Sequence, residues 1–104
     1  MKRKNNSYTS IEPLVKALLK DPKVRMIYEE RKAKESLALA VKELRKNAHL
    51  TQSELAKKAG TTQVVIARLE SGTDTRTTSM PLLARIATAC GRHLEIGFPT
   101  KRYA

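Results

Sequence analysis

Hydrophobic residues recur every three to four positions along most of the chain, which is the spacing of one face of an α-helix. The first such stretch begins with Thr9-Ser10-Ile11-Glu12, a capping box whose side chains would bond the free amides of a first turn. A helix this short needs a surface to pack on, either in this chain, in a second copy or in another protein. Its apolar positions are Ile11, Leu14, Val15, Leu18 and Leu19.

A longer helical stretch begins at Asp21-Pro22, because Asp favours the cap and Pro the first position of a helix. Two apolar groups follow, and the polar residues 29–35 separate them. We expect helices over 22–33 and 35–47, and the pattern leaves open whether they form one rod or a kinked pair. The two groups are Val24, Ile27 and Tyr28, and Leu37, Val41 and Leu44.

Residues 51–70 show the pattern of two short helices around a tight turn. Thr51-Gln52-Ser53-Glu54 is a second capping box, Gly60 tolerates a positive φ, and Thr61 is expected to cap the next helix. A helix-turn-helix needs a permissive turn residue and small residues where its helices cross, and this segment has both. The inward positions are Leu55, Ala56, Ala59, Ile66 and Leu69.

The second of these helices carries side chains suited to the major groove of DNA. Gln can bond an adenine edge, Arg can bond guanine or a phosphate, and Val can contact a thymine methyl group. The start of the first helix offers hydroxyl and amide groups to phosphate, and a loop arginine could add a further phosphate contact. The predicted DNA-binding residues are Thr51, Gln52, Ser53, Thr62, Gln63, Val64, Ala67, Arg68 and Arg76.

Beyond a polar loop, Ser79 is placed to cap a last helix, which Gly91 ends. The inward positions of that helix are Leu83, Ile86, Ala87 and Cys90. His93–Phe98 then alternates polar and apolar residues, which predicts a short β-strand. The chain offers no second clear strand, so we expect this one to pair with its copy in a homodimer. The predicted dimerisation residues are Leu94, Ile96 and Phe98.

Composition narrows the class of partner. The net charge of +11, from 21 Lys and Arg against 10 Asp and Glu, favours a polyanion such as DNA, RNA or anionic lipid. The four aromatic residues are scattered along the chain, which disfavours the stacking platforms that bind single strands or RNA. We therefore expect double-stranded operator DNA as the partner.

Other functional classes find little support in the residues. A single cysteine, Cys90, forms no internal disulfide and suits the cytoplasm, and we expect neither a secretory signal nor a membrane span. His49 and His93 have no Cys or carboxylate at metal-ligand spacing, so neither a metal nor another cofactor is expected. No catalytic constellation stands out, and we do not expect an enzyme.

The stretch LTQSELAKKAGTTQVVIARLESG, residues 50–72, resembles the Cro/cI-type (XRE) helix-turn-helix family. The resemblance covers about residues 36–91 and implies a mainly all-α domain of five to six helices that binds two DNA half-sites as a dimer. Members of the family usually pair an Arg of the first helix with a Glu near the end of the recognition helix. The resemblance therefore implies a structural ion pair between Arg45 and Glu70, and a phosphate contact of Arg45 is the alternative or an addition to it.

The flanking stretches DPKVRMIYE, residues 21–29, and GRHLEIGF, residues 91–98, look like those of HigA-type antitoxins. This narrower resemblance implies a protein that neutralises a RelE/HigB-like ribonuclease toxin and represses its own operon. The alternative is an orphan regulator of a phage or mobile element, with no toxin partner. The expected partner-binding residues are Leu14, Leu18, Val24, Ile27 and Tyr28.

We expect four segments in the chain. Residues 1–8 form a disordered basic terminus, and residues 9–34 form a helical extension that could bind a partner. Residues 35–91 form the DNA-binding domain, and residues 92–104 supply the strand and a tail.

Overall fold

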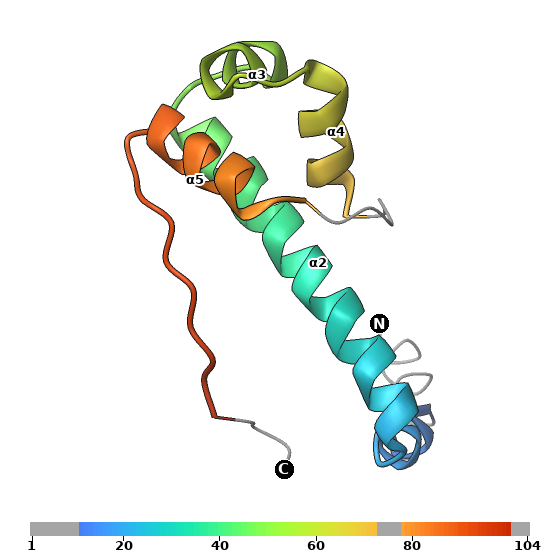
Figure 1. Cartoon of the computed structure of the whole chain (residues 1–104). Helices are drawn as coiled ribbons and strands as arrows, with labels where there is room; N and C mark the ends of the chain where they lie inside the picture. Colours follow the sequence, from blue (N-terminus) through green and yellow to red (C-terminus); the bar gives the residue numbers. More distant parts are fainter. Residues whose placement is uncertain (1–10, 73–77, 101–104) are drawn as a thin grey trace. The chain divides into compact units, whose positions relative to one another are not determined.

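A computed structural model describes residues 11–72 and 78–100, and these residues are helical with connecting loops (Figure 1). Residues 11–18 form a first helix. The others are α2 (Pro22–Asn47), α3 (Gln52–Ala59), α4 (Gln63–Ser71) and α5 (Met80–Ala89). No helix in this part of the chain is long and apolar enough to cross a bilayer. The chain divides into two compact units, residues 1–36 and 37–104, with the boundary inside α2.

The first unit contains the helix over 11–18 and the first half of α2. The turn between them matches the sequence prediction, because the Asp21 carboxylate accepts a hydrogen bond from the Lys23 amide at 2.9 Å. The Arg25 side chain also donates to the Leu19 carbonyl at 2.9 Å. Thr9 and Ser10 of the predicted first capping box lie outside the described residues.

α2 runs from Pro22 to Asn47 without a break at the polar residues 29–35. Residues 29–35 contain no Gly or Pro and consist entirely of Glu, Arg, Lys and Ala, all of which favour helix. The helix ends where the Leu50 amide donates to the Arg45 carbonyl and the His49 amide to the Lys46 carbonyl. This Schellman closure places His49 at a φ of 60°, a conformation that usually requires glycine.

The core of the second unit lies where α3, α4, α5 and the end of α2 meet. Leu55, Ile66 and Ile86 are fully buried, one each from α3, α4 and α5. Ala56 and Ala59 are buried beside them, and their small side chains let the helices approach closely. The inward positions expected from sequence are confirmed for the buried residues and for Leu69 and Cys90, which are half-buried against the core. On α5, Leu82 packs against the core rather than the expected Leu83.

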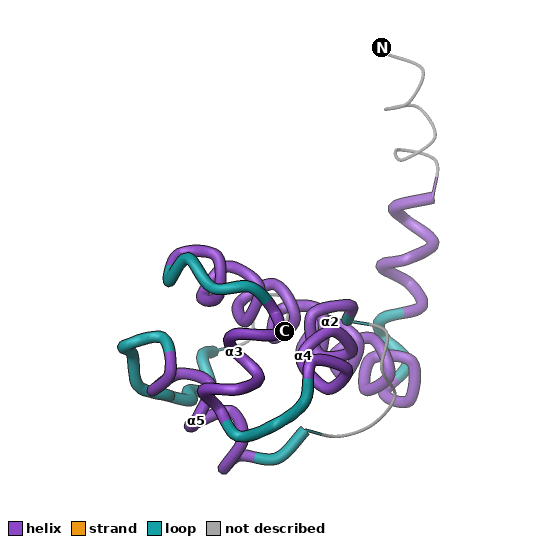
Figure 2. The backbone as a smooth tube through the Cα atoms, turned by 90° about the horizontal axis from the view of Figure 1, so that it is seen from above, coloured by secondary structure: helices purple, strands orange, loops and turns teal. Residues whose placement is uncertain are grey.

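The predicted β-strand over His93–Phe98 is wrong: the described residues contain no strand, and 92–100 form an irregular segment (Figure 2). Alternation alone does not make a strand, because the backbone groups need a second strand to bond. Leu94 is half-buried against the helices, whereas Ile96 and Phe98 are exposed. Of the three alternating apolar residues, Leu94 thus packs against the helices, whereas the other two are exposed to solvent.

Candidate nucleic-acid interface

The first helix of the motif, α3, has a defined start. The Thr51 hydroxyl accepts a hydrogen bond from the Glu54 amide at 3.0 Å, and the Glu54 carboxylate accepts one from the Thr51 amide at 2.8 Å. This is the predicted capping box, and it satisfies two donors of the first turn. Thr51 and Ser53 are exposed here and Gln52 is half-buried, which leaves their polar groups beside the helix N-terminus.

The turn between α3 and α4 depends on Gly60, which has a φ of 72°. The Thr61 amide closes the end of α3 by donating to the Ala56 carbonyl at 2.9 Å. The cap of α4 is therefore Thr62, one residue later than predicted, and its hydroxyl accepts from the Val65 amide at 3.3 Å. The predicted cap, Thr61, is one residue too early, because the Thr61 amide is bonded to the end of α3.

α4 presents the predicted base-reading side chains on its outer surface. Gln63, Val64 and Arg68 are exposed and Ala67 is half-buried, and together with Ser71 they line an open hollow of about 370 Å³. Val64 is 56% exposed whereas Val65 is half-buried, so of the two adjacent valines Val64 is the one available to a ligand. Ser71 was not predicted, although it follows Ala67 and Arg68 at helical spacing.

A chain of side-chain hydrogen bonds runs from the core of the motif to this surface. Arg45 of α2 donates to both carboxylate oxygens of Glu70, at 2.6 and 3.0 Å, and to the Leu50 carbonyl at 2.9 Å. Gln52 donates to the same carboxylate at 3.2 Å, and Gln63 donates to the Gln52 amide oxygen at 3.5 Å. These contacts join α2, α3 and α4.

Glu70 is the one buried charged residue in the described part of the chain, at 6% exposure. Burial favours its neutral form, but the hydrogen bonds from Arg45 and Gln52, with the charges of Arg45 and Lys42, outweigh burial and lower the pKa of Glu70. The bond to Glu70 also raises the pKa of Arg45 despite partial burial. The ion pair implied by the family resemblance is therefore present, and both partners are charged at neutral pH.

Arg85 of α5 contributes a contact that the sequence did not reveal. Its Nε donates to the Ala59 carbonyl at 2.8 Å, beside the Gly60 turn. A positive group at the C-terminal end of a helix is favourable, because the last carbonyls there lack helical partners. The bond ties α5 to the junction of α3 and α4, but no pattern at position 85 distinguishes it from a solvated arginine.

The remaining predicted site residues are placed as follows. Arg76 lies outside the described residues. In the first unit Leu14, Leu18 and Ile27 are exposed, at 60%, 48% and 64%. Val24 and Tyr28 are half-buried in the same unit.

The described part of the chain is expected to hold neither a metal ion nor a reactive cysteine, and its side chains bear on both questions. No cluster of three His, Cys, Asp or Glu side chains there could hold a metal ion. Cys90 is half-buried, and burial raises the pKa of its thiol against the lowering effect of Lys58 and Arg92. A raised pKa disfavours the reactive thiolate at neutral pH.

The comparisons agree with the geometry of α3 and α4. The helix-turn-helix family model HTH_3 matches residues 41–96, more than half of the chain. No curated protein and no solved structure matches the chain. The matched range runs from the end of α2 through α5 and includes the whole hydrogen-bond network. The chain therefore belongs to the HTH_3 family, the Cro/cI-type (XRE) helix-turn-helix domains, which bind specific DNA sequences and are typically regulators rather than enzymes.

Proposed function

We propose that the protein is a dimeric transcriptional repressor that inserts α4 into the major groove of operator DNA. One observation carries the proposal: Gln63, Val64 and Arg68 are exposed on a helix that is fixed to the core from behind. Exposed side chains read bases well when the element that bears them is rigid, because misplacement weakens directional hydrogen bonds. The second copy would bind a second half-site about one helical turn away.

The start of α3 suits the neighbouring phosphates. Its first amides point away from the helix, and Thr51, Gln52 and Ser53 add polar side chains there. Gln52 also contacts Gln63, so a phosphate bound by Gln52 would help to orient the Gln63 amide toward a base. The net charge of +11 adds attraction that does not depend on sequence.

Binding to an operator duplex enriched from a random library tests this proposal. Gln63→Ala and Arg68→Ala should each weaken binding by about 1–3 kcal/mol, measured by fluorescence anisotropy at fixed salt. Arg31→Ala is the matched control, because it removes one exposed charge from the first unit and should have a small effect. If the α4 variants bind as tightly as the control, α4 is not the recognition helix.

A second role, as the antitoxin of a RelE/HigB-like toxin, is favoured by the first unit. None of its described side chains is buried, although six large apolar ones are at least 41% exposed. Such a surface is costly in water unless a partner covers it. The exposed residues are Ile11, Leu14, Val15, Leu18, Met26 and Ile27.

The antitoxin role is tested by co-expression with the product of the adjacent reading frame. Rescue of growth that is lost in a Leu14→Glu/Leu18→Glu variant would support it. The matched control is Lys16→Glu, which adds negative charge to the same helix without removing an apolar contact. If the adjacent frame encodes no toxin and no growth defect is rescued, the orphan regulator of a phage or mobile element is the better description.

A further inference from the structure

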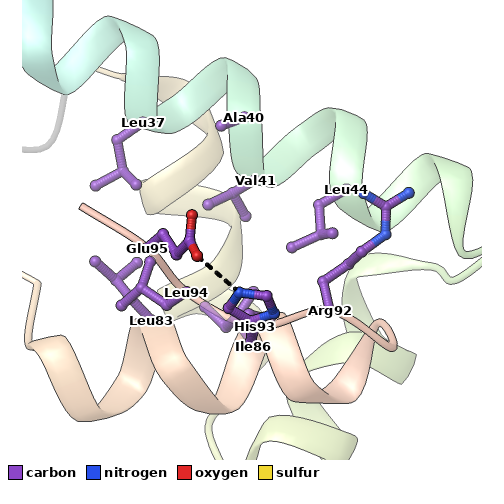
Figure 3. Close-up of a pocket in the computed structure, with 11 residues that line it drawn as sticks. Leu37, Ala40, Val41, Leu44, Leu83, Ile86, Arg92, His93, Leu94 and Glu95 are labelled. Carbon is purple, nitrogen blue, oxygen red and sulfur yellow. Dashed lines mark hydrogen bonds and ion pairs between the residues drawn. The ribbon is translucent and has the colours of Figure 1, made fainter. Parts of the chain in front are cut away.

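The second unit has an apolar cavity of about 400 Å³ that its own side chains leave open (Figure 3). α2 supplies Leu37, Val41 and Leu44 from one side, and α5 supplies Leu83 and Ile86 from the other. Leu94 projects into the same space from the C-terminal segment. The cavity is partly open to water, so an apolar group that entered it would remove apolar surface of both partners from water.

The C-terminal segment also carries an almost fully solvent-exposed apolar side chain, Phe98. Phe98 is 96% exposed, the highest value among the exposed large hydrophobic residues, and it lies four positions after Leu94. A phenyl ring that moves from water into an apolar site is stabilised substantially. The cavity exceeds the size of one phenyl ring, and its lining is mostly aliphatic, with Arg92, His93 and Glu95 of the C-terminal segment as its polar part.

We propose that Phe98 of one copy fills the α2–α5 cavity of a second copy, and that the insertion is reciprocal. This inference rests on the proposed dimeric DNA-binding function and names the contact that forms the dimer. A chain with both a protruding group and a matching hollow can form a closed two-fold pair, because each copy presents both parts. No β-pairing is involved, since 92–100 is not a strand.

The local backbone favours insertion into the partner over insertion into the same chain. Phe98 precedes Pro99, and a residue before proline is restricted to extended conformations. Only Ile96 and Gly97 separate Phe98 from Glu95, which lines the cavity. A return of the ring into its own cavity needs a sharp reversal within these few residues, and an extended Phe98 opposes it.

The size of this contact indicates a weak dimer in the absence of DNA. Two inserted phenylalanines bury about 300–500 Å² in total, whereas stable interfaces exceed about 1,000 Å². DNA with two half-sites would supply the missing affinity by holding both copies close together. The inference therefore predicts reversible association of the free protein and cooperative binding to paired half-sites.

Fluorescence tests the insertion, because the chain contains no Trp. In a Phe98→Trp variant the indole should emit at a long wavelength in dilute solution and shift to shorter wavelength as concentration rises from about 1 µM to 1 mM. Emission at short wavelength at every concentration would place the ring in its own chain and overturn the proposal. Emission at long wavelength at every concentration would show that the ring enters no cavity, which also overturns it.

A complementation experiment tests reciprocity. Phe98→Ala removes the inserting ring, and Ala40→Glu places a charge at the cavity from an exposed position of α2. Each variant alone should associate at least about tenfold more weakly than the original protein in sedimentation. Their equimolar mixture should recover part of that loss, because Phe98 of the second variant can enter the open cavity of the first.

Met80→Ala is the matched control, because Met80 is 53% exposed but does not line the cavity. It should associate like the original protein. If the mixture associates no better than the single variants, the insertion is not reciprocal and the proposal fails. Binding to a single half-site is measured in parallel, and if it persists while association is absent, the DNA-binding function stands and only this inference is overturned.

Discussion

The guanidinium group of Arg45 holds both carboxylate oxygens of Glu70, at 2.6 and 3.0 Å, and so fixes the end of α4 to α2. Glu70 lies on the same helix as Gln63 and Arg68, the candidate base-reading residues. The two side chains are 13% and 2% exposed, so water screens the pair little. The position of the recognition helix therefore depends on an interaction that contacts no DNA.

Breaking this pair from one side should destabilise the protein. Arg45→Met leaves the Glu70 carboxylate buried without its main partner, and it should lower the free energy of unfolding by about 3–5 kcal/mol. The double variant Arg45→Met/Glu70→Met should be more stable than Arg45→Met, because it removes the buried charge. Urea unfolding measures these values, with Lys32→Met, at an exposed position of the same helix, as the control. A double variant less stable than Arg45→Met would contradict this account.

Acid should weaken the same interaction. The pKa of Glu70 is lowered by folding, so its stabilising contribution is complete above the ordinary value of 4.5 and is lost as pH falls through the lower folded pKa. The difference in unfolding free energy between the original protein and Glu70→Gln should therefore shrink as pH drops below about 4.5. Urea titrations between neutral pH and pH 3 measure it. A difference that stays constant with pH would show that Glu70 ionisation does not stabilise the fold.

His49 offers a stabilising substitution. Its φ of 60° costs a residue with a side chain about 1 kcal/mol relative to glycine, and His49 has no side-chain bond in the described structure. His49→Gly should therefore raise the melting temperature by about 4–8 °C. Gly60→Ala should have the opposite effect, because Gly60 has a φ of 72° in the turn. A lower melting temperature for His49→Gly would indicate that the imidazole makes a compensating contact.

The bond from Arg85 to the Ala59 carbonyl should contribute measurably to stability. Arg85→Met keeps the aliphatic stem but removes the donor, and it should lower the free energy of unfolding by about 1 kcal/mol. Lys57→Met, which removes an exposed charge of α3, is the control and should change it by less than about 0.5 kcal/mol. If both variants lowered the free energy of unfolding equally, the hydrogen bond of Arg85 would add nothing beyond the loss of one positive charge.

Much of the fold could be predicted because its signals are local. The Thr51 capping box, the Ser79 cap and the glycine at position 60 each act on backbone groups within a few residues. The helical register of Ile66 and Ile86 follows from periodicity alone. The exposure of Gln63 and Arg68 follows from the same register, which is why the candidate site could be located without a structure.

What could not be predicted depends on contacts distant in sequence. The strand expected at His93–Phe98 needed a partner that the alternation cannot supply, and only packing separates the anchored Leu94 from the exposed Phe98. The bond of Arg85 to Ala59 spans 26 positions and leaves no trace in the local pattern. The link from Gln52 to Glu70 likewise depends on how α3 crosses α4.

The central claim is that α4 reads DNA bases, and a base-preference profile tests it most directly. Binding-site selection from random duplexes would be run on the original protein and on Gln63→Ala, with Arg31→Ala as the control. We predict a defined preferred sequence for the original protein and the control, and a loss of preference confined to one or two positions of each half-site for Gln63→Ala. An unchanged profile for Gln63→Ala, or no preferred sequence for the original protein, would contradict the claim.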